Sequence, residues 1–340
     1  MRFSGVKFAS RRGLVAAALF AGVVAAVATA PRVVGARVDE AIDRLGQAEP
    51  AWLWLAALCF VSALLASAQA WRTALRLCGG RLSRADAAAR YGIGSLVNSL
   101  APVRVGEAAR VALFAQALEG EDRAWRMGGV FATITVTRSL VFAVALGAAA
   151  ATGAVPLWPL VAICGLVAVA ATAVVVARRR VPRRHVAHLL DAFRELGRSP
   201  VRAARIVGWS VVGTVTRFVA AVSIAASLDV RSPVTAALIV VPALDLAGLI
   251  PLSANFGVTS GTVAVALQAH GVGLGTAVTA GLAFHAVETA AGLIFGVASA
   301  LLLAGEGGGV ARRRSLVLAG ATACACIAAA FWASVVLPLI

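Results

Sequence analysis

The sequence predicts an all-α, polytopic membrane protein: a transmembrane helix bundle of about seven full spans plus two broken re-entrant hairpins. Two observations carry this prediction. Hydrophobic residues make up 61% of the 340 residues and charged residues only 14%, a balance more apolar than that of soluble domains. The apolar residues also gather in runs of about 20, the length that an α-helix needs to cross a bilayer. Most of the surface is therefore expected to face lipid.

The apolar runs that are long enough to span a membrane are spread along the whole chain. They lie at residues 13–30, 51–71, 127–152, 155–177, 206–228, 275–304 and 315–337. We interpret residues 1–340 as a single integral membrane domain, with a core at 13–304, a basic cytoplasmic loop at 178–205 and a C-terminal span at 315–337. The first run is also similar to a signal peptide, but its length and the proline that follows the candidate cleavage site favour a retained span.

Two further apolar segments are interrupted by helix-breaking residues. Residues 84–118 are broken at 101–106, and residues 233–270 are broken at 251–257, in both cases by proline and glycine. Each half is too short to cross the bilayer. We interpret both segments as re-entrant hairpins, because irregular backbone is tolerated at membrane depth only inside protein or beside water.

The distribution of arginine predicts the topology, since cytoplasmic loops are enriched in basic residues. Basic clusters lie at residues 2–12, 72–90, 178–184 and 312–314. All of them face the cytoplasm if the first hairpin enters from the cytoplasm and the second from outside. The N-terminus is then cytoplasmic and the C-terminus lies outside.

The same layout relates residues 51–152 to residues 206–304 as an inverted repeat of span, hairpin and span. Paired broken segments in inverted halves are the sequence pattern that best indicates a transporter site at the membrane midplane. The two breaks are therefore expected to meet near the middle of the bilayer.

The net charge of +16 does not indicate nucleic-acid binding, because the arginines lie in short clusters beside apolar runs. Residues 186–205 form either a helix that lies on anionic lipid headgroups or an ordinary connecting helix.

The five cysteines are scattered, and no nucleotide-binding motif is visible. We expect no cofactor, no metal site and no ATP-driven pumping by this chain alone. Lys7 is its only lysine, which is typical of a GC-rich genome and favours a bacterial inner membrane.

Residues 98–110 place Arg104, Glu107 and Arg110 inside the membrane. Charges at the bilayer centre cost about 2.5–3.5 kcal/mol each, so such a cluster indicates a functional site. The three residues are spaced by three and share one helix face, where Glu107 can pair with either arginine. The remaining positive charge suits a phosphate, especially with a helix N-terminus beginning near Gly106. Asn98 of the same segment is a further candidate substrate-binding residue. The alternative is that the cluster is an internal brace between broken helices.

Other polar residues are also predicted at membrane depth. Arg138 and Arg217 lie near the middle of their spans, where either contacts a headgroup or pairs with Asp245 or Glu288. Asp245 is either a proton-carrying acid or the partner of Arg217. His285 and Glu288 are one helical turn apart and form either a proton relay or a packing pair. The second break supplies two further polar groups, at Ser253 and Asn255, where unwound backbone can meet a polar substrate.

The pattern N-x-L-x-P-x-R-x-G-E-x-x-R at residues 98–110 resembles the flippase-like integral membrane family that includes the transmembrane domain of lysylphosphatidylglycerol synthases. The residues that match are Asn98, Leu100, Pro102, Arg104, Gly106, Glu107 and Arg110. The second break is similar to a later motif of the family, at Pro251, Ser253, Gly257 and Val258. Three positions lack an acid of the family: Thr137, Val141 and Ser260. Any ion coupling or salt bridge that the family makes through these acids therefore lacks its carboxylate in this chain.

The resemblance implies a lipid flippase or transporter that moves an anionic or polar-headed lipid, such as an aminoacylated or glycosylated one, between leaflets. Its expected partners are a membrane phospholipid or lipid-linked substrate and a lipid-synthesis enzyme. We expect no soluble aminoacyltransferase domain here, so the chain itself is not expected to be an enzyme. The alternatives are a membrane-embedded enzyme that modifies a lipid headgroup or lipid-linked sugar, with Asp245 or Glu288 as general base, and a non-transporting scaffold of a lipid-synthesis complex.

Overall fold

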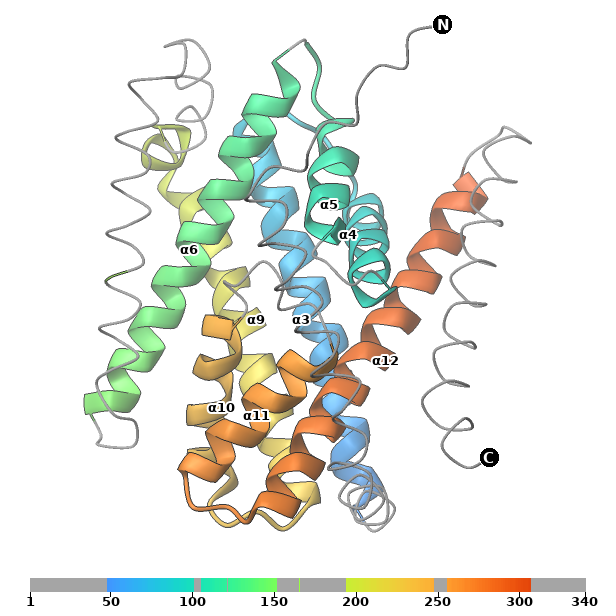
Figure 1. Cartoon of the computed structure of the whole chain (residues 1–340). Helices are drawn as coiled ribbons and strands as arrows, with labels where there is room; N and C mark the ends of the chain where they lie inside the picture. Colours follow the sequence, from blue (N-terminus) through green and yellow to red (C-terminus); the bar gives the residue numbers. More distant parts are fainter. Residues whose placement is uncertain are drawn as a thin grey trace, which may run out of the picture.

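The computed structural model describes residues 48–100, 105–120, 122–151, 165, 194–247 and 256–306. Within these ranges the chain is helical and falls into two sets of four helices (Figure 1). The helices are α3 (Pro50–Leu77), α4 (Arg84–Leu100), α5 (Val105–Ala115), α6 (Arg123–Ala151), α9 (Pro200–Ser227), α10 (Pro233–Ala247), α11 (Phe256–Ala269) and α12 (Leu274–Glu306). The predicted all-α class is confirmed.

Four of the helices, α3, α6, α9 and α12, are long and apolar enough to cross a membrane. They contain the spans predicted at 51–71, 127–152, 206–228 and 275–304, apart from the last residue of the second and of the third, so these four predictions are confirmed. Their outer faces carry exposed large apolar side chains, for example Trp54, Leu140, Val144 and Leu301. Such faces suit contact with lipid tails, because soluble proteins rarely expose large contiguous apolar patches.

The helices between these spans are short and come in pairs. The α4 and α5 helices pack together on either side of the first break, and α10 and α11 do the same around the second. With 17, 11, 15 and 14 residues, none reaches the roughly 20 residues of a full span. Figure 1 shows α4 and α5 beside the upper part of α3, and α10 and α11 beside the lower part of α9. The hairpins thus enter from opposite ends, as the sequence predicts.

The two sets of helices run in opposite directions. The backbone N–H of Glu49, directly before α3, donates a hydrogen bond of 3.3 Å to the carbonyl oxygen of Ser227, the last residue of α9. The start of α3 therefore meets the end of α9. These two helices occupy equivalent places in the two sets, and they make the most extensive contact between helices. The repeated order of span, hairpin and span and the antiparallel packing of α3 and α9 agree with the inverted repeat predicted from hydropathy.

Each half of the molecule has its own apolar core. One core lies around α4, α5 and the start of α6, where Trp71 packs against Phe114 with ring centroids 5.1 Å apart. The other lies among α9 to α12, where Phe60 of α3 meets Phe284 of α12 edge to face at 5.1 Å. Because α3 contributes to both cores, it ties the halves together.

Glycine allows α4 and α12 to cross closely. A Cβ atom on Gly296 of α12 would lie 2.6 Å from the Cβ atom of Leu96 and 3.0 Å from the carbonyl oxygen of Gly92, both on α4. Small residues that bring backbones close are the main means by which transmembrane helices pack. This crossing attaches the first hairpin to the last helix of the second half.

The helix that contains the span predicted at 206–228 begins earlier than that span. The basic loop was predicted to run to residue 205, but α9 already begins at Pro200 after the N-cap position Ser199. Proline suits the first helical position because its missing N–H would be unsatisfied there. Arg202 and Arg205 therefore belong to the first turns of a transmembrane helix, where long basic side chains reach toward the membrane surface. The spans predicted at 13–30, 155–177 and 315–337, and the loop before residue 194, lie outside the described residues, apart from residue 165 in the second of these spans.

Candidate functional site

The α4–α5 hairpin contains a buried arginine cluster. Arg110 of α5 donates a hydrogen bond of 2.7 Å from Nη1 to Oε1 of Glu107, one turn earlier. Its Nη2 donates to the Ser95 hydroxyl on α4 at 2.9 Å. The guanidinium lies over the ring of Tyr91, 4.2 Å from the ring centroid, a favourable cation–π geometry. These contacts fasten α5 to α4.

The hairpin closes tightly around this arginine. A Cβ atom on Gly106 would collide with the carbonyl oxygen of Gly94 and with the side chain of Asn98. Within the described residues, Oδ1 of Asn98 and Nε of Arg110 are the buried side-chain polar atoms that have no hydrogen-bond partner. The glycine of the Gly-Glu-x-x-Arg pattern thus has a physical reason, because only glycine allows this approach.

A second ionic cluster joins four helices. Arg138 of α6 donates from Nη2 to Oδ1 of Asp245 on α10 at 2.9 Å. Arg217 of α9 forms an ion pair of 3.6 Å with the same oxygen. Arg217 also donates from Nη2 to Oε1 of Glu288 on α12 at 3.1 Å. We call these four residues the ionic network; its two formal positive charges balance its two negative ones.

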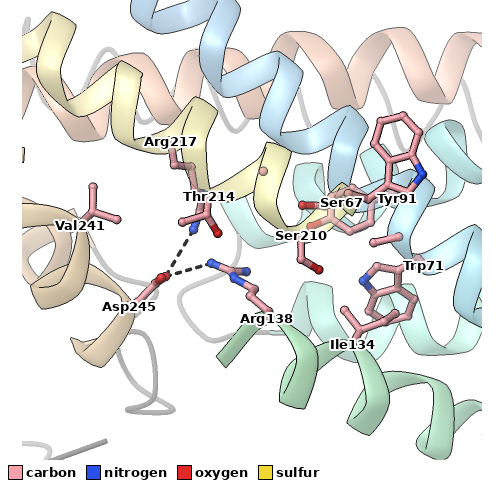
Figure 2. Close-up of a pocket in the computed structure, with 13 residues that line it drawn as sticks. Ser67, Trp71, Tyr91, Ile134, Arg138, Ser210, Thr214, Arg217, Val241 and Asp245 are labelled. Carbon is pink, nitrogen blue, oxygen red and sulfur yellow. Dashed lines mark hydrogen bonds and ion pairs between the residues drawn. The ribbon is translucent and has the colours of Figure 1, made fainter. Parts of the chain in front are cut away.

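The ionic network opens on a small cavity of about 50 Å³ between the two halves. Figure 2 shows Arg138 and Arg217 directed toward Asp245, with Trp71 and Tyr91 at the other end of the cavity. A cavity of this size holds a few water molecules, at about 10–15 Å³ each. It is too small for a lipid headgroup, so a headgroup requires the side chains or helices around it to move.

Tyr91 connects the two clusters. It lines the cavity together with Arg138, and its ring lies under the guanidinium of Arg110. The hydroxyl groups of Ser67 and Ser210 also line the cavity, and each donates to a carbonyl of its own helix. The cavity therefore combines cationic, acidic and neutral polar groups.

The structure groups most of the predicted site residues. The ionic network brings together Arg138, Arg217, Asp245 and Glu288. The pair of Glu107 and Arg110 lies in the hairpin beside Asn98. The remaining predicted residues, Arg104, Ser253 and Asn255, lie outside the described residues.

The contacts bear on two of the alternatives that the sequence leaves open. Asp245 is a partner of Arg217, as one alternative held, and it also binds Arg138. Glu288 is directed to Arg217, whereas Nε2 of His285 lies 3.4 Å from the Thr289 hydroxyl. In this conformation Glu288 is therefore an ion-pair partner, and the proton relay remains a prediction.

Sequence analysis missed Tyr91 and Ser95. Tyr91 is the only tyrosine in the chain, and Tyr91, Ser95 and Asn98 are spaced by four and three residues. This spacing puts them on one face of α4, the face that meets α5. The helical spacing of these polar residues in an apolar segment is the sequence pattern that could have identified them.

A helical bundle of two oppositely directed halves, each with a broken hairpin, and with ion pairs between the halves, defines a class of multi-pass membrane protein. Comparison with known families gives the identity more closely. The sequence model of the family described as "Lysylphosphatidylglycerol synthase TM region" matches residues 13–296, and the chain belongs to this family. It is therefore a membrane protein related to lipid modification or transport. No curated protein and no solved structure matches the chain significantly.

Proposed function

We propose that the protein moves an anionic or polar-headed lipid between the leaflets of a bacterial inner membrane without changing the lipid chemically. The observation that carries the proposal is the ionic network, which lies where the two inverted halves meet. In transporters with inverted repeats, the substrate site lies at the repeat interface near the midplane. The family membership adds the connection to lipids.

The exposure of the arginine side chains indicates which of the two clusters binds the lipid headgroup. The side chain of Arg110 is 8% exposed and already has three partners. The side chains of Arg138 and Arg217 are 47% and 35% exposed. We therefore place the headgroup at Arg138 and Arg217 and treat Arg110 as the brace that keeps the hairpin closed. The acyl tails stay in the surrounding lipid, because only the headgroup needs a polar environment.

Reconstitution tests the proposed translocation. Purified protein in liposomes with a fluorescent phosphatidylglycerol is treated with a membrane-impermeant quencher, and we expect the inner-leaflet label to become accessible. Arg138→Gln with Arg217→Gln should abolish the exchange. Arg202→Gln is the matched control, because Arg202 pairs with Glu195 on the surface and is similarly exposed. Equal exchange by the double variant and the wild type would contradict the assigned role.

Mass spectrometry of the same lipids separates the proposal from its rivals. A transporter changes only the sidedness of the lipid, whereas an enzyme changes its mass. A scaffold changes neither and loses function only when its partner is absent. The same assay with Arg104→Ala tests the predicted contribution of the first break.

A further inference from the structure

The two arginines of the ionic network share one oxygen atom. Oδ1 of Asp245 lies 2.9 Å from Nη2 of Arg138 and 3.6 Å from Nη1 of Arg217. Each guanidinium presents several N–H donors in a planar fork that matches two oxygens of a carboxylate or phosphate. A single shared oxygen uses only part of this capacity. The site therefore holds more donors than Asp245 satisfies.

We propose that Asp245 occupies the place of a lipid phosphate, and that a phosphodiester monoanion binds between Arg138 and Arg217 by displacing the Asp245 carboxylate. The inference rests on the proposed function and identifies the chemical group that the site recognises. The two non-bridging oxygens of a phosphodiester accept from both guanidinium groups at once. Glu288 remains on Arg217 and keeps that side chain in place.

The charge balance supports this exchange. With Asp245 in place, the ionic network has no net formal charge, which lowers the cost of keeping it at membrane depth. When Asp245 leaves, Arg138, Arg217 and Glu288 together carry one positive charge. A phosphodiester monoanion restores neutrality, whereas a neutral sugar headgroup leaves the charge uncompensated. The site is therefore expected to favour anionic phospholipids over neutral glycolipids.

The packing around Asp245 allows the displacement. Asp245 lies in the last turn of α10, three residues after Pro242, which removes a backbone hydrogen bond inside the helix. Contact between α10 and α6 is among the least extensive between described helices. Turning the Asp245 carboxylate away breaks its ion pairs with Arg138 and Arg217, but it separates few contacts between α10 and α6.

Lipid retention by charge variants tests the exchange. Native mass spectrometry of the detergent-solubilised protein measures bound phosphatidylglycerol and bound diglucosyl diacylglycerol. Asp245→Asn should retain about tenfold more phosphatidylglycerol than the wild type, since the phosphate no longer competes with a carboxylate for charged hydrogen bonds. Retention of the glycolipid should not change. Glu195→Gln is the matched control because it frees a surface arginine, Arg202, and it should bind as the wild type does.

Competition with free phosphate shows whether the site recognises the whole lipid or only its phosphate group. If inorganic phosphate at millimolar concentration displaces phosphatidylglycerol from Asp245→Asn, the site recognises phosphate as such. If it does not, the acyl chains contribute to recognition, and the lipid is the ligand. Equal phosphatidylglycerol retention by Asp245→Asn and Glu195→Gln would overturn the proposal.

A measurement on the wild-type protein covers the case in which Asp245→Asn does not fold. Dicyclohexylcarbodiimide labels carboxyl groups in apolar surroundings, and peptide mapping locates the label. Phosphatidylglycerol should increase labelling of Asp245 at least twofold, because the displaced carboxyl loses its arginine partners, and labelling of Glu107 should stay constant as the internal reference. A lipid that merely covers the cavity would decrease labelling of Asp245, and this result would overturn the exchange.

These outcomes are independent of translocation. If leaflet exchange is absent but Asp245→Asn retains more phosphatidylglycerol, the phosphate site stands and the proposed transport fails. If exchange occurs but neither retention nor labelling changes as expected, transport stands and the phosphate exchange fails.

Discussion

Two arginines at membrane depth have different environments and therefore different expected roles. Arg110 is buried among partners of its own hairpin, whereas Arg217 lies between helices and beside the cavity. A buried cation with an ion-pair partner is costly to move, because breaking a buried pair leaves an uncompensated charge. A half-exposed cation exchanges its partner at lower cost. The degree of burial thus separates a brace from a binding group.

Ser95 provides a test of the brace. Its hydroxyl donates to the carbonyl of Tyr91 at 3.3 Å and accepts from Arg110 at 2.9 Å. Ser95→Ala leaves a buried guanidinium N–H without its acceptor, so we expect a loss of about 1–3 kcal/mol in unfolding free energy. Equilibrium unfolding in mixed micelles measures this loss.

Ser62→Ala is the matched control for this test. The Ser62 hydroxyl is exposed and donates only to the carbonyl of Leu58 in its own helix. Its removal should change the unfolding free energy by less than about 0.5 kcal/mol, as is usual for surface substitutions. Similar losses in both variants would show that Ser95 does not support a brace.

At the residue scale, the sequence predicts which residues are polar at membrane depth but not how they pair. Arg138 and Asp245 are separated by 107 positions, and each arginine had two candidate acids. The choice depends on how α6, α9, α10 and α12 are arranged in space. No local pattern contains that information, so only the structure shows that Asp245 serves both arginines.

The elements themselves were predictable because length and hydropathy decide them. Apolar runs of about 20 residues give spans, and proline or glycine in shorter runs gives the hairpins. The start of α9 was misplaced because Arg202 and Arg205 are typical of a loop. Long basic side chains can extend along the helix to the membrane surface, so charge alone does not mark the end of a span.

The crossing of α4 and α12 gives a prediction for these elements. Gly296→Ala places a Cβ atom against Leu96 and the backbone of Gly92, neither of which is a flexible chain end. We expect a loss of about 1–3 kcal/mol in unfolding free energy from overpacking. Gly208→Ala in α9 is the control, because a Cβ atom there meets no atom within 4 Å. The control should be neutral or up to about 1 kcal/mol more stable, since alanine favours helix, and an equal loss in both variants would exclude a close crossing.

The whole molecule departs from the symmetry of its repeat in one respect. Contact between α4 and α12 is extensive, whereas the equivalent pair in the other half, α10 and α6, makes little contact. Each pair joins a hairpin to the last helix of the opposite half. In an inverted repeat, exchanging the two arrangements gives the conformation open to the other side. Under the proposed lipid transport, the described structure is therefore one of two states.

A reversible disulfide at the closed crossing tests whether this exchange occurs. The Ser299 hydroxyl lies 3.5 Å from the carbonyl oxygen of Ala88, so cysteines at both positions, in a chain whose native cysteines are replaced, should lock α4 to α12. We expect oxidation to stop lipid exchange and dithiothreitol to restore it. The control places cysteines at Glu49 and Ser227, where α3 meets α9. Because α3 and α9 are equivalent helices, both states retain this contact. Oxidation there should therefore leave lipid exchange intact. If the oxidised protein, with α4 locked to α12, still exchanges lipid as fast as the dithiothreitol-treated protein, the asymmetry of the two crossings is a fixed feature of the fold. It is then not one state of a transport cycle.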